Sequence, residues 1–209
     1  MLLPSFIAHI TPQPSSRAST SSGRPCPTMP SHSYTLRQPT SGEAEALSAL
    51  ICSTWTQAFG HAVPASVVEE AIAGPLSPST IEQQISDPST HFLVATYQPQ
   101  QGSEQIIGVA QLRAGLSEAC LQLPNSTSLR KLYVDAAHHG TGVARDLLLA
   151  AEEMARKDGW SSIWLTVWEG NARGKRFYEK MGYEVKGQKP SDLRGGSRGI
   201  VDFVMEKAL

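Results

Sequence analysis

One run of residues constrains the fold more than any other, a short apolar strand that leads through a glycine loop into a helix. It extends from Leu132 to Ala144, and apolar residues then recur at helical spacing up to Gly159. The first backbone N–H groups of a helix have no partner within the helix, and the helix dipole adds partial positive charge there. Gly140 and Gly142 would let a ligand approach the backbone closely, so the run predicts an anion-binding loop.

Two common phosphate-binding motifs do not fit this loop. It lacks the Gly-Lys-Ser/Thr ending of a P-loop, and its glycines do not have the spacing of the dinucleotide-binding fingerprint. An ordinary turn from strand to helix therefore stays open as the alternative to an anion site.

Length and charge set the broad class. A chain of 209 residues is suited to one α/β domain with a substantial core, and it has no apolar run long enough to span a membrane. The net charge of −1 argues against a general nucleic-acid-binding protein. Charge is nevertheless uneven: residues 1–126 contain four Lys or Arg and eight Asp or Glu, whereas residues 127–209 contain fourteen and eleven. The half with the glycine loop is the basic half, which suits an anionic ligand.

The N-terminal 33 residues differ from the rest of the chain. They are rich in Ser, Thr and Pro and contain no Asp or Glu, so we expect a disordered extension. The alternatives are an organellar targeting segment or translation from Met29. We expect the folded domain to span residues 34–209 and to be cytoplasmic, with a mitochondrial location as the alternative. Cys26, Cys52 and Cys120 have no disulfide or metal-ligand spacing.

The remaining pattern predicts an α/β fold, a mixed sheet flanked by helices on both faces. Strands are expected at residues 34–38, 91–97, 106–112, 129–134, 162–168, 183–186 and 201–205. Helices are expected at about 40–59, 66–73, 143–158 and 171–181, with another helical piece after Ser79. A loop rich in Gly and Arg, residues 187–199, would join the last two strands.

Two blocks between Leu132 and Gly182 resemble the GNAT superfamily of acetyl-CoA-dependent N-acetyltransferases. The first, from His139 to Ala144, is similar to the family motif Arg/Gln-x-x-Gly-x-Gly/Ala, with His139 in the usual Arg or Gln position. The second, from Asn171 to Tyr183, resembles Asn-x-x-Ala-x-x-x-Tyr-x-x-x-Gly-Phe/Tyr, with Gly where Ala is usual. The sequence around Asn171 is most similar to that of the subgroup of bacterial polyamine acetyltransferase-like proteins.

The resemblance implies the acyl-CoA N-acyltransferase fold, acetyl-CoA as co-substrate and a set of site residues. Two neighbouring parallel strands, 129–134 and 163–168, would part to hold the pantetheine arm, and the loop would hold the pyrophosphate. Cofactor binding would involve Leu132, Tyr133, Val134, His139, Gly140, Thr141, Gly142, Val143, Ala144, Asn171 and Tyr178. Tyr178 would be the general acid that protonates the leaving thiolate, and the amide of Val134 would donate to the oxyanion.

Other roles stay open in the sequence. Many relatives carry a Glu as general base where this chain has Ser126-Thr127-Ser128, so a water, Glu118 or Glu169 are the alternatives. Three cations could meet the cofactor phosphates or form an exposed face: Arg173, Lys175 and Arg176. Three aromatic residues of the N-terminal half could line the acceptor site or the core: Tyr34, Trp55 and Phe59. No metal-ligand spacing is present.

The implied reaction is transfer of acetyl from acetyl-CoA to a primary amine of a small molecule, by direct attack in a ternary complex. A protein or peptide acceptor is the alternative within the same class, and a catalytically silent acetyl-CoA-binding module is the alternative outside it. We expect a monomer or homodimer that has neither nucleic acid nor membrane as a partner.

Overall fold

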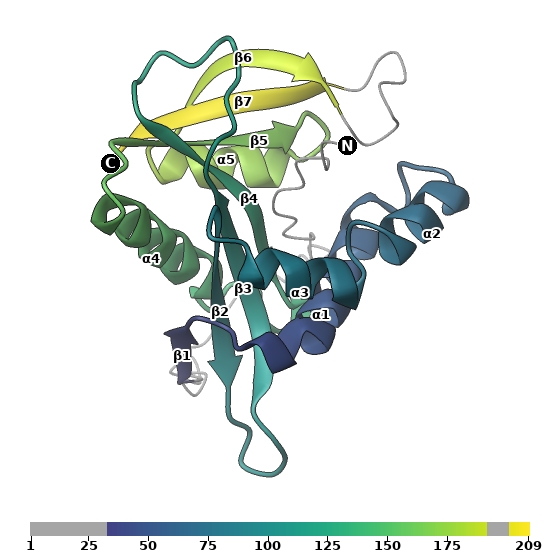
Figure 1. Cartoon of the computed structure of the whole chain (residues 1–209). Helices are drawn as coiled ribbons and strands as arrows, with labels where there is room; N and C mark the ends of the chain where they lie inside the picture. Colours follow the sequence, from purple (N-terminus) through teal and green to yellow (C-terminus); the bar gives the residue numbers. More distant parts are fainter. Residues whose placement is uncertain (1–32, 192–200) are drawn as a thin grey trace, which may run out of the picture.

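The computed structural model describes residues 33–191 and 201–209, which form one seven-stranded sheet with helices on both faces (Figure 1). The strand order is β1-β2-β3-β4-β5-β7-β6, and the β4–β5 pair is parallel whereas the other pairs are antiparallel. This confirms the predicted mixed α/β fold. The expectations for residues 1–32, including Cys26, and for residues 192–199 of the predicted loop lie outside the described residues.

The elements follow one another in an order close to the predicted one. The strands are β1 Tyr34–Arg37, β2 Thr90–Tyr97, β3 Gln105–Arg113, β4 Ser126–Val134, β5 Ser162–Trp168, β6 Glu184–Pro190 and β7 Val201–Ala208. The helices are α1 Ala44–Phe59, α2 Ala65–Ala73, α3 Pro78–Ser86, α4 Val143–Lys157 and α5 Ala172–Lys180, with 3-10 turns η1 Ser41–Glu43 and η2 Ala136–His138. Within the described ranges, none of these helices is both long and apolar enough to cross a bilayer.

Several boundaries differ from the sequence prediction, including the end of β7 at Ala208 and the start of α1 at Ala44, and three of the differences have a clear physical reason. The helical piece after Ser79 is a full helix, α3, which begins with Pro78 in its first turn and is capped by the Ser77 hydroxyl. β4 begins at Ser126 rather than 129, because the hydroxyl residues that suggest a loop are paired with β5. β6 extends to Pro190, so residues 187–190 are strand and not loop, held by their pairing with β7.

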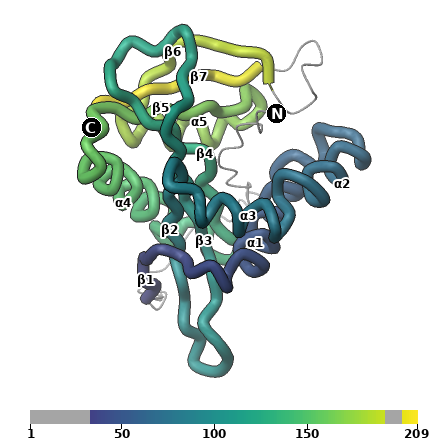
Figure 2. The backbone as a smooth tube through the Cα atoms, viewed as in Figure 1, coloured from purple at the N-terminus to yellow at the C-terminus, as the bar shows by residue number. Residues whose placement is uncertain are grey.

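The helices divide the core into two clusters, one on each face of the sheet. In Figures 1 and 2, α1 and α3 lie on one side of β2, β3 and β4, whereas α4 lies on the other. The predicted stripe of α1 is buried under the first face, with Leu47, Ile51 and Trp55 completely covered. Leu147 and Leu148 of α4 and Tyr178 of α5 belong to the second cluster.

β4 and β5 pair over only part of their length. Their parallel ladder joins Ser126–Ser128 to Ser162–Trp164. The β3–β4 register then shifts, because Leu112 is opposite Leu129 whereas Gln111 is opposite Lys131, which leaves Arg130 as an extra residue. Such a bulge bends a strand. After it, β4 and β5 have no ladder, and this opening in the sheet is where the candidate site lies.

Candidate functional site

The backbone of β4 presents free polar groups to the opening. In an antiparallel ladder, hydrogen-bonded and non-hydrogen-bonded pairs alternate. The N–H of Asp135 donates to the carbonyl of Ile107 at 2.8 Å, so the next pair, Val134 and Gly108, is of the non-bonded kind. The N–H and C=O groups of Val134, and by the same alternation those of Leu132, therefore point away from β3 and towards β5. Those of Tyr133 point to β3.

β5 presents a matching edge. The N–H of Glu169 donates to the carbonyl of Val201 at 2.9 Å, which makes the adjacent pair, Trp168 and Asp202, non-bonded on the β7 side. The backbone groups of Thr166 and the N–H of Trp168 therefore point towards β4, whereas the Trp168 carbonyl accepts a hydrogen bond from the N–H of Asn171 at 2.8 Å. Because the two strands have parted, these facing edges can accept an extended, amide-containing ligand between them.

Buried side-chain groups without a partner gather on β4, β5 and α5, both in the paired segment of the two strands and beside the opening. Within the described chain, five such groups lack a hydrogen-bond partner: the hydroxyls of Ser128, Tyr133, Thr166 and Tyr178 and the indole N–H of Trp164. Four of the five belong to β4 or β5, and Tyr178 belongs to α5. Native structures leave few buried polar groups unpaired, so this concentration indicates a site that a polar ligand completes.

The glycine loop lies at the end of β4 with the conformation that the sequence predicts. Gly140 and Gly142 have φ of 80° and 98°, in the left-handed region that favours glycine, and Gly142 caps the N-terminus of α4. The opening turn of α4 thus directs its free N–H groups outwards beside the loop, which is the arrangement that binds phosphate groups.

His139 occupies the position of the usual Arg or Gln and turns back onto the strand. Its Nε2 lies 2.9 Å from the carbonyl oxygen of Val134, so this nitrogen donates the hydrogen bond. The ring therefore fixes one of the free backbone groups of β4. Burial lowers the pKa of His139, and the positive charge of the nearby Arg173 lowers it further, whereas the hydrogen bond to Val134 raises it. Because the lowering effects are larger, the ring tends towards its neutral form.

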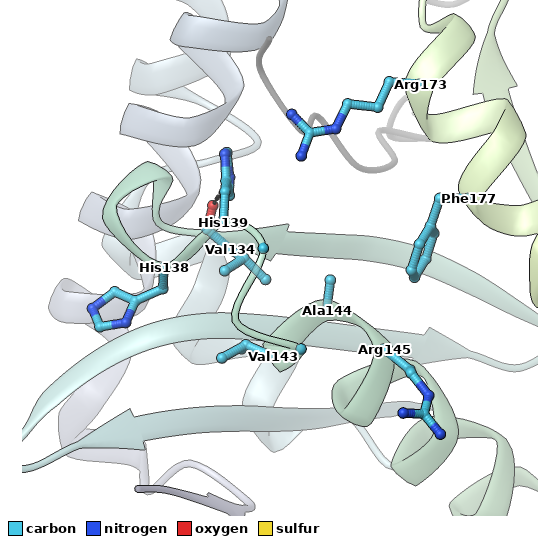
Figure 3. A pocket seen from close by; sticks show the side chains of 10 residues that line it. Val134, His138, His139, Val143, Ala144, Arg145, Arg173 and Phe177 are labelled. Carbon is cyan, nitrogen blue, oxygen red and sulfur yellow. Dashed lines mark hydrogen bonds between the residues drawn. The ribbon is translucent and has the colours of Figure 1, made fainter. Parts of the chain in front are cut away.

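A cavity of about 200 Å³ lies between the loop and α5. Loop and α4 residues between His138 and Arg145, other than Thr141, line one side together with Val134, and Arg173 and Phe177 of α5 line the other (Figure 3). The exposed Thr141 hydroxyl instead donates to the carbonyl of His138 at 2.7 Å. Figure 3 shows Arg173 extending across the cavity from α5 towards His139. Two histidines and two arginines are thus among the residues that line this cavity beside the N-terminus of α4, and such a lining suits a diphosphate.

α5 positions both residues of the second motif. The Asn171 side chain accepts a hydrogen bond from the N–H of Gly174 at 2.8 Å and caps the helix, and its carboxamide is buried. A Cβ at Gly174 would lie 2.4 Å from the Asn171 amide nitrogen, which explains a glycine where the family usually has alanine. Tyr178, completely buried, points into the core beside the parted strands.

Several candidates lie elsewhere. Lys175 is paired with Glu179 and lies over the ring of Phe203, and Arg176 is exposed. The Tyr34 hydroxyl donates to Asp146 at 2.6 Å and so joins β1 to α4. Trp55 and Phe59 are buried in the α1 cluster, although Phe59 contacts Trp168 at the end of β5, with ring centroids 5.9 Å apart.

The two carboxylates considered as bases are both engaged. Glu118 forms an ion pair with Lys189 at 2.8 Å, and Glu169 accepts a hydrogen bond from the N–H of Val201 at 3.4 Å. In residues 33–191 and 201–209, no group of three or more His, Cys, Asp or Glu is arranged to hold a metal ion. Sequence reasoning missed His138, Arg145 and Phe177 as cavity residues, and only their closeness to the two motifs could have suggested them.

Comparison with known proteins agrees with this geometry. The model of the acetyltransferase (GNAT) family matches residues 51–183. An uncharacterized N-acetyltransferase of Mycobacterium bovis is 28% identical over 167 residues, covering 80% of this chain and 98% of the relative. PaiA N-acetyltransferase from Thermoplasma acidophilum, crystallised with coenzyme A, has a TM-score of 0.66 at 24% identity, covering 85% of this chain and 99% of that one. The ribosomal-protein-S18-alanine N-acetyltransferase from Escherichia coli has a TM-score of 0.57 at 17% identity, covering 84% and 94%.

The family match covers more than half of the chain and contains the glycine loop, the parted strands and the whole of α5. The groups around the opening match the chemistry of acetyl-CoA. The backbone groups of β4 and β5 can form hydrogen bonds with its amides, and the basic glycine loop can bind its phosphates. The chain belongs to the acetyltransferase (GNAT) family and is an acetyl-CoA-dependent N-acetyltransferase.

Proposed function

We propose that the protein transfers acetyl from acetyl-CoA to a primary amine of a small molecule, by direct attack within a ternary complex. The observation that carries the proposal is the opening between β4 and β5, where the backbone groups of Leu132 and the N–H of Val134 point into the gap beside a basic glycine loop. A thioester held there would have the N–H of Val134 within reach of its carbonyl oxygen as an oxyanion donor.

An aromatic group on the α1 side supports a small acceptor. Trp168 at the end of β5 contacts the rings of Phe59 and His61, with centroids 5.9 Å and 6.3 Å away. Aromatic faces bind ammonium groups and apolar bodies. The alternative is a protein or peptide acceptor, since the Escherichia coli enzyme that is named for an alanine of ribosomal protein S18 shares the fold. At 17% identity that likeness bears on the fold alone.

Titration calorimetry with acetyl-CoA tests the cofactor part of the proposal. Gly142→Glu places bulk and negative charge at the N-terminus of α4, so we expect wild-type binding in the micromolar range and loss of at least tenfold in the variant. Gly115→Glu is the matched control, because it is also a glycine at positive φ but lies in a loop, with open space where its Cβ would stand. It should bind as the wild type does.

A panel of amines and N-terminal peptides then tests the acceptor. Release of coenzyme A with small primary amines, lost in Tyr178→Phe, would support the proposal. Turnover with peptides alone would favour the protein acceptor. Binding of acetyl-CoA without turnover on any acceptor would favour the silent module.

A further inference from the structure

Three buried polar groups on β4 and β5 have no hydrogen-bond partner within the described chain. They are the hydroxyls of Ser128 and Thr166 and the indole N–H of Trp164, and each of these side chains is at most 1% exposed. A buried polar group that is left unpaired destabilises a fold, and alanine, valine or phenylalanine would fill most of the same space without that cost. Three such groups close together therefore indicate a ligand that pairs them.

The three side chains lie on the same face of the sheet, the face on which α1 packs. Trp168 contacts the α1 cluster, and residues two apart on a strand point to the same face, so Trp164 and Thr166 lie on this face as well. The residues of β5 that alternate with them belong to the core cluster of α4. Ser128 is opposite Trp164 in the β4–β5 ladder, and its neighbour Leu129 belongs to the α4 cluster, so the Ser128 hydroxyl lies beside Trp164.

Along the strands, these groups stand where β4 and β5 begin to part. Ser128 and Trp164 form the last pair of the ladder, and Thr166 is the next residue of β5 on this face, about 7 Å further on at the usual rise of a strand. Trp168 and Phe59, which the proposed function assigns to the acceptor, follow at the end of β5. An acceptor that enters beside Trp168 and Phe59 can therefore extend along this face to the three unpaired groups.

The neighbouring polar side chain on β7 is paired by the fold itself. Glu206 is opposite Trp164, and its buried carboxylate accepts hydrogen bonds from the N–H groups of Gln122 and Leu123 at 3.1 Å and 3.0 Å. The fold thus provides partners for a buried polar group on this face, which sets the three unpaired groups apart. The Glu206 carboxylate also disfavours an anionic ligand, because a second carboxylate beside Trp164 would meet a like charge.

The hydrogen-bonding capacity of the three groups selects the kind of ligand atom that pairs them. An indole N–H can only donate, whereas a hydroxyl can donate or accept. An alkylammonium group can donate to the hydroxyls of Ser128 and Thr166, but it has no lone pair for the N–H of Trp164. A neutral oxygen, in a hydroxyl or an amide, can accept from Trp164 and also pair with a hydroxyl.

We propose that Ser128, Trp164 and Thr166 bind a neutral oxygen of the acceptor, so that the acceptor is a primary amine that carries a hydroxyl or an amide rather than a plain alkyl amine or polyamine. The inference rests on the N-acetyl transfer proposed above and narrows the class of its acceptor. The three residues set specificity and take no part in the transfer of protons.

Steady-state kinetics with matched amines measure this preference. Ethanolamine carries the oxygen as a hydroxyl and glycinamide carries it as an amide, propylamine and putrescine lack it, and in glycine it is charged. We expect kcat/KM of the wild type to be about 10²-fold or more higher for ethanolamine or glycinamide than for the other three, because a site built to hydrogen-bond a substrate group strongly rejects an analogue without it. The better of the two substrates identifies the oxygen as hydroxyl or amide.

Two conservative variants assign the preference to these residues. Ser128→Ala and Thr166→Val each remove one unpaired hydroxyl, and we expect each to reduce the preference about tenfold or more, mainly through a higher KM for the oxygen-bearing acceptor. Affinity for acetyl-CoA, measured by calorimetry, should stay within about twofold. The thermal stability of both free variants should be unchanged or higher, because neither hydroxyl has a partner to lose.

Thr127→Val is the matched control. Thr127 precedes Ser128 on β4 and is also buried, but its hydroxyl donates to the carbonyl of Arg113 at 3.3 Å, so the fold itself uses it. This variant should lower the melting temperature by about 2–4 °C and leave the acceptor preference as in the wild type. Ser128→Ala should do the opposite, with a reduced preference and no loss of stability.

Three results would overturn this inference. Equal kcat/KM for propylamine and for the oxygen-bearing amines would do so while leaving the acetyltransferase proposal intact. An unchanged preference in both Ser128→Ala and Thr166→Val, or a change confined to acetyl-CoA affinity, would show that these groups do not bind the acceptor. A wild-type protein that binds acetyl-CoA but transfers acetyl to no amine would overturn the inference together with the proposed reaction.

Discussion

At the scale of single residues, Lys131 is the most unusual side chain in the sheet. It is buried on β4, and its Nζ donates to the amide oxygens of Gln111 at 2.6 Å and Gln84 at 3.2 Å. Burial, with Arg130 and Arg113 nearby, lowers the pKa of Lys131 to about 7. A neutral amine has two N–H groups and uses both here, whereas an ammonium would leave a third donor and a buried charge without a carboxylate among its partners.

This lysine makes stability depend on pH. Between its folded pKa of about 7 and its ordinary value of 10.5, the unfolded chain binds more protons than the folded one, so stability should rise with pH across this window. Lys131→Met removes the titrating group. The difference in free energy of unfolding between Lys131→Met and wild type should be larger at pH 6 than at pH 10 by about 2–4 kcal/mol, in favour of the variant.

Urea denaturation at the two pH values measures this difference. Lys157→Met is the control, because Lys157 is an exposed residue of α4 with 74% of its side-chain surface accessible. That variant should follow the wild-type curve within about 0.5 kcal/mol. Parallel curves for wild type and Lys131→Met would show that Lys131 stays charged in the fold.

At the scale of elements, α4 is joined to the far half of the sheet by a buried carboxylate. Glu152 of α4 is almost completely buried and accepts hydrogen bonds from Lys207 of β7, at 2.7 and 2.8 Å, and from the Tyr183 hydroxyl. Since β4 and β5 pair only through their first residues, this contact helps to fix the glycine-loop helix relative to β7.

Removing one partner should destabilise the protein more than removing both. Lys207→Met would leave the Glu152 carboxylate buried without its main cation, and we expect thermal and denaturant unfolding to show a loss of about 3–5 kcal/mol. In the double variant with Glu152→Leu, no buried charge is left without a partner, so most of the lost free energy of unfolding should be recovered. A double variant as unstable as the sum of the two singles would show that Glu152 and Lys207 contribute independently and that no charge is left uncompensated by removing one of them.

The elements also show what sequence could and could not predict. Strand β5, apolar on both faces, and the helical stripes of α1 and α4 are buried as their periodicity predicted. The beginning of β4 was missed, because Ser126–Ser128 resemble a loop in composition and are strand only through their partners on β5. The loop of the site was predictable from Gly140 and Gly142, whose φ values require glycine. The unpaired hydroxyls of Tyr133 and Tyr178 were not, because an unmade contact between distant segments leaves no local signal.

At the scale of the whole molecule, the sheet consists of two parts that are joined by one short strand pair. β1–β4 form one part and β5–β7 the other, and three residue pairs of β4 and β5 connect them in the ladder. A ligand between the parted strands would supply the missing connection. Binding should therefore stabilise the whole fold, by about 2.7 kcal/mol when acetyl-CoA is present at 100 times its dissociation constant.

Amide hydrogen exchange can test this connection residue by residue. Leu132 and Val134 direct their N–H groups into the opening, whereas the N–H groups of Tyr133 and Asp135 point to β3. We expect NMR to show fast exchange at Leu132 and Val134 in the free protein, slowed about tenfold or more by coenzyme A, while Tyr133 and Asp135 are protected in both states. Thr166 and Trp168 should behave in the same way as Leu132 and Val134, because their backbone groups face the opening from β5. Equal protection of neighbouring amides, with or without ligand, would mean that the strands close in solution and that the cofactor binds elsewhere.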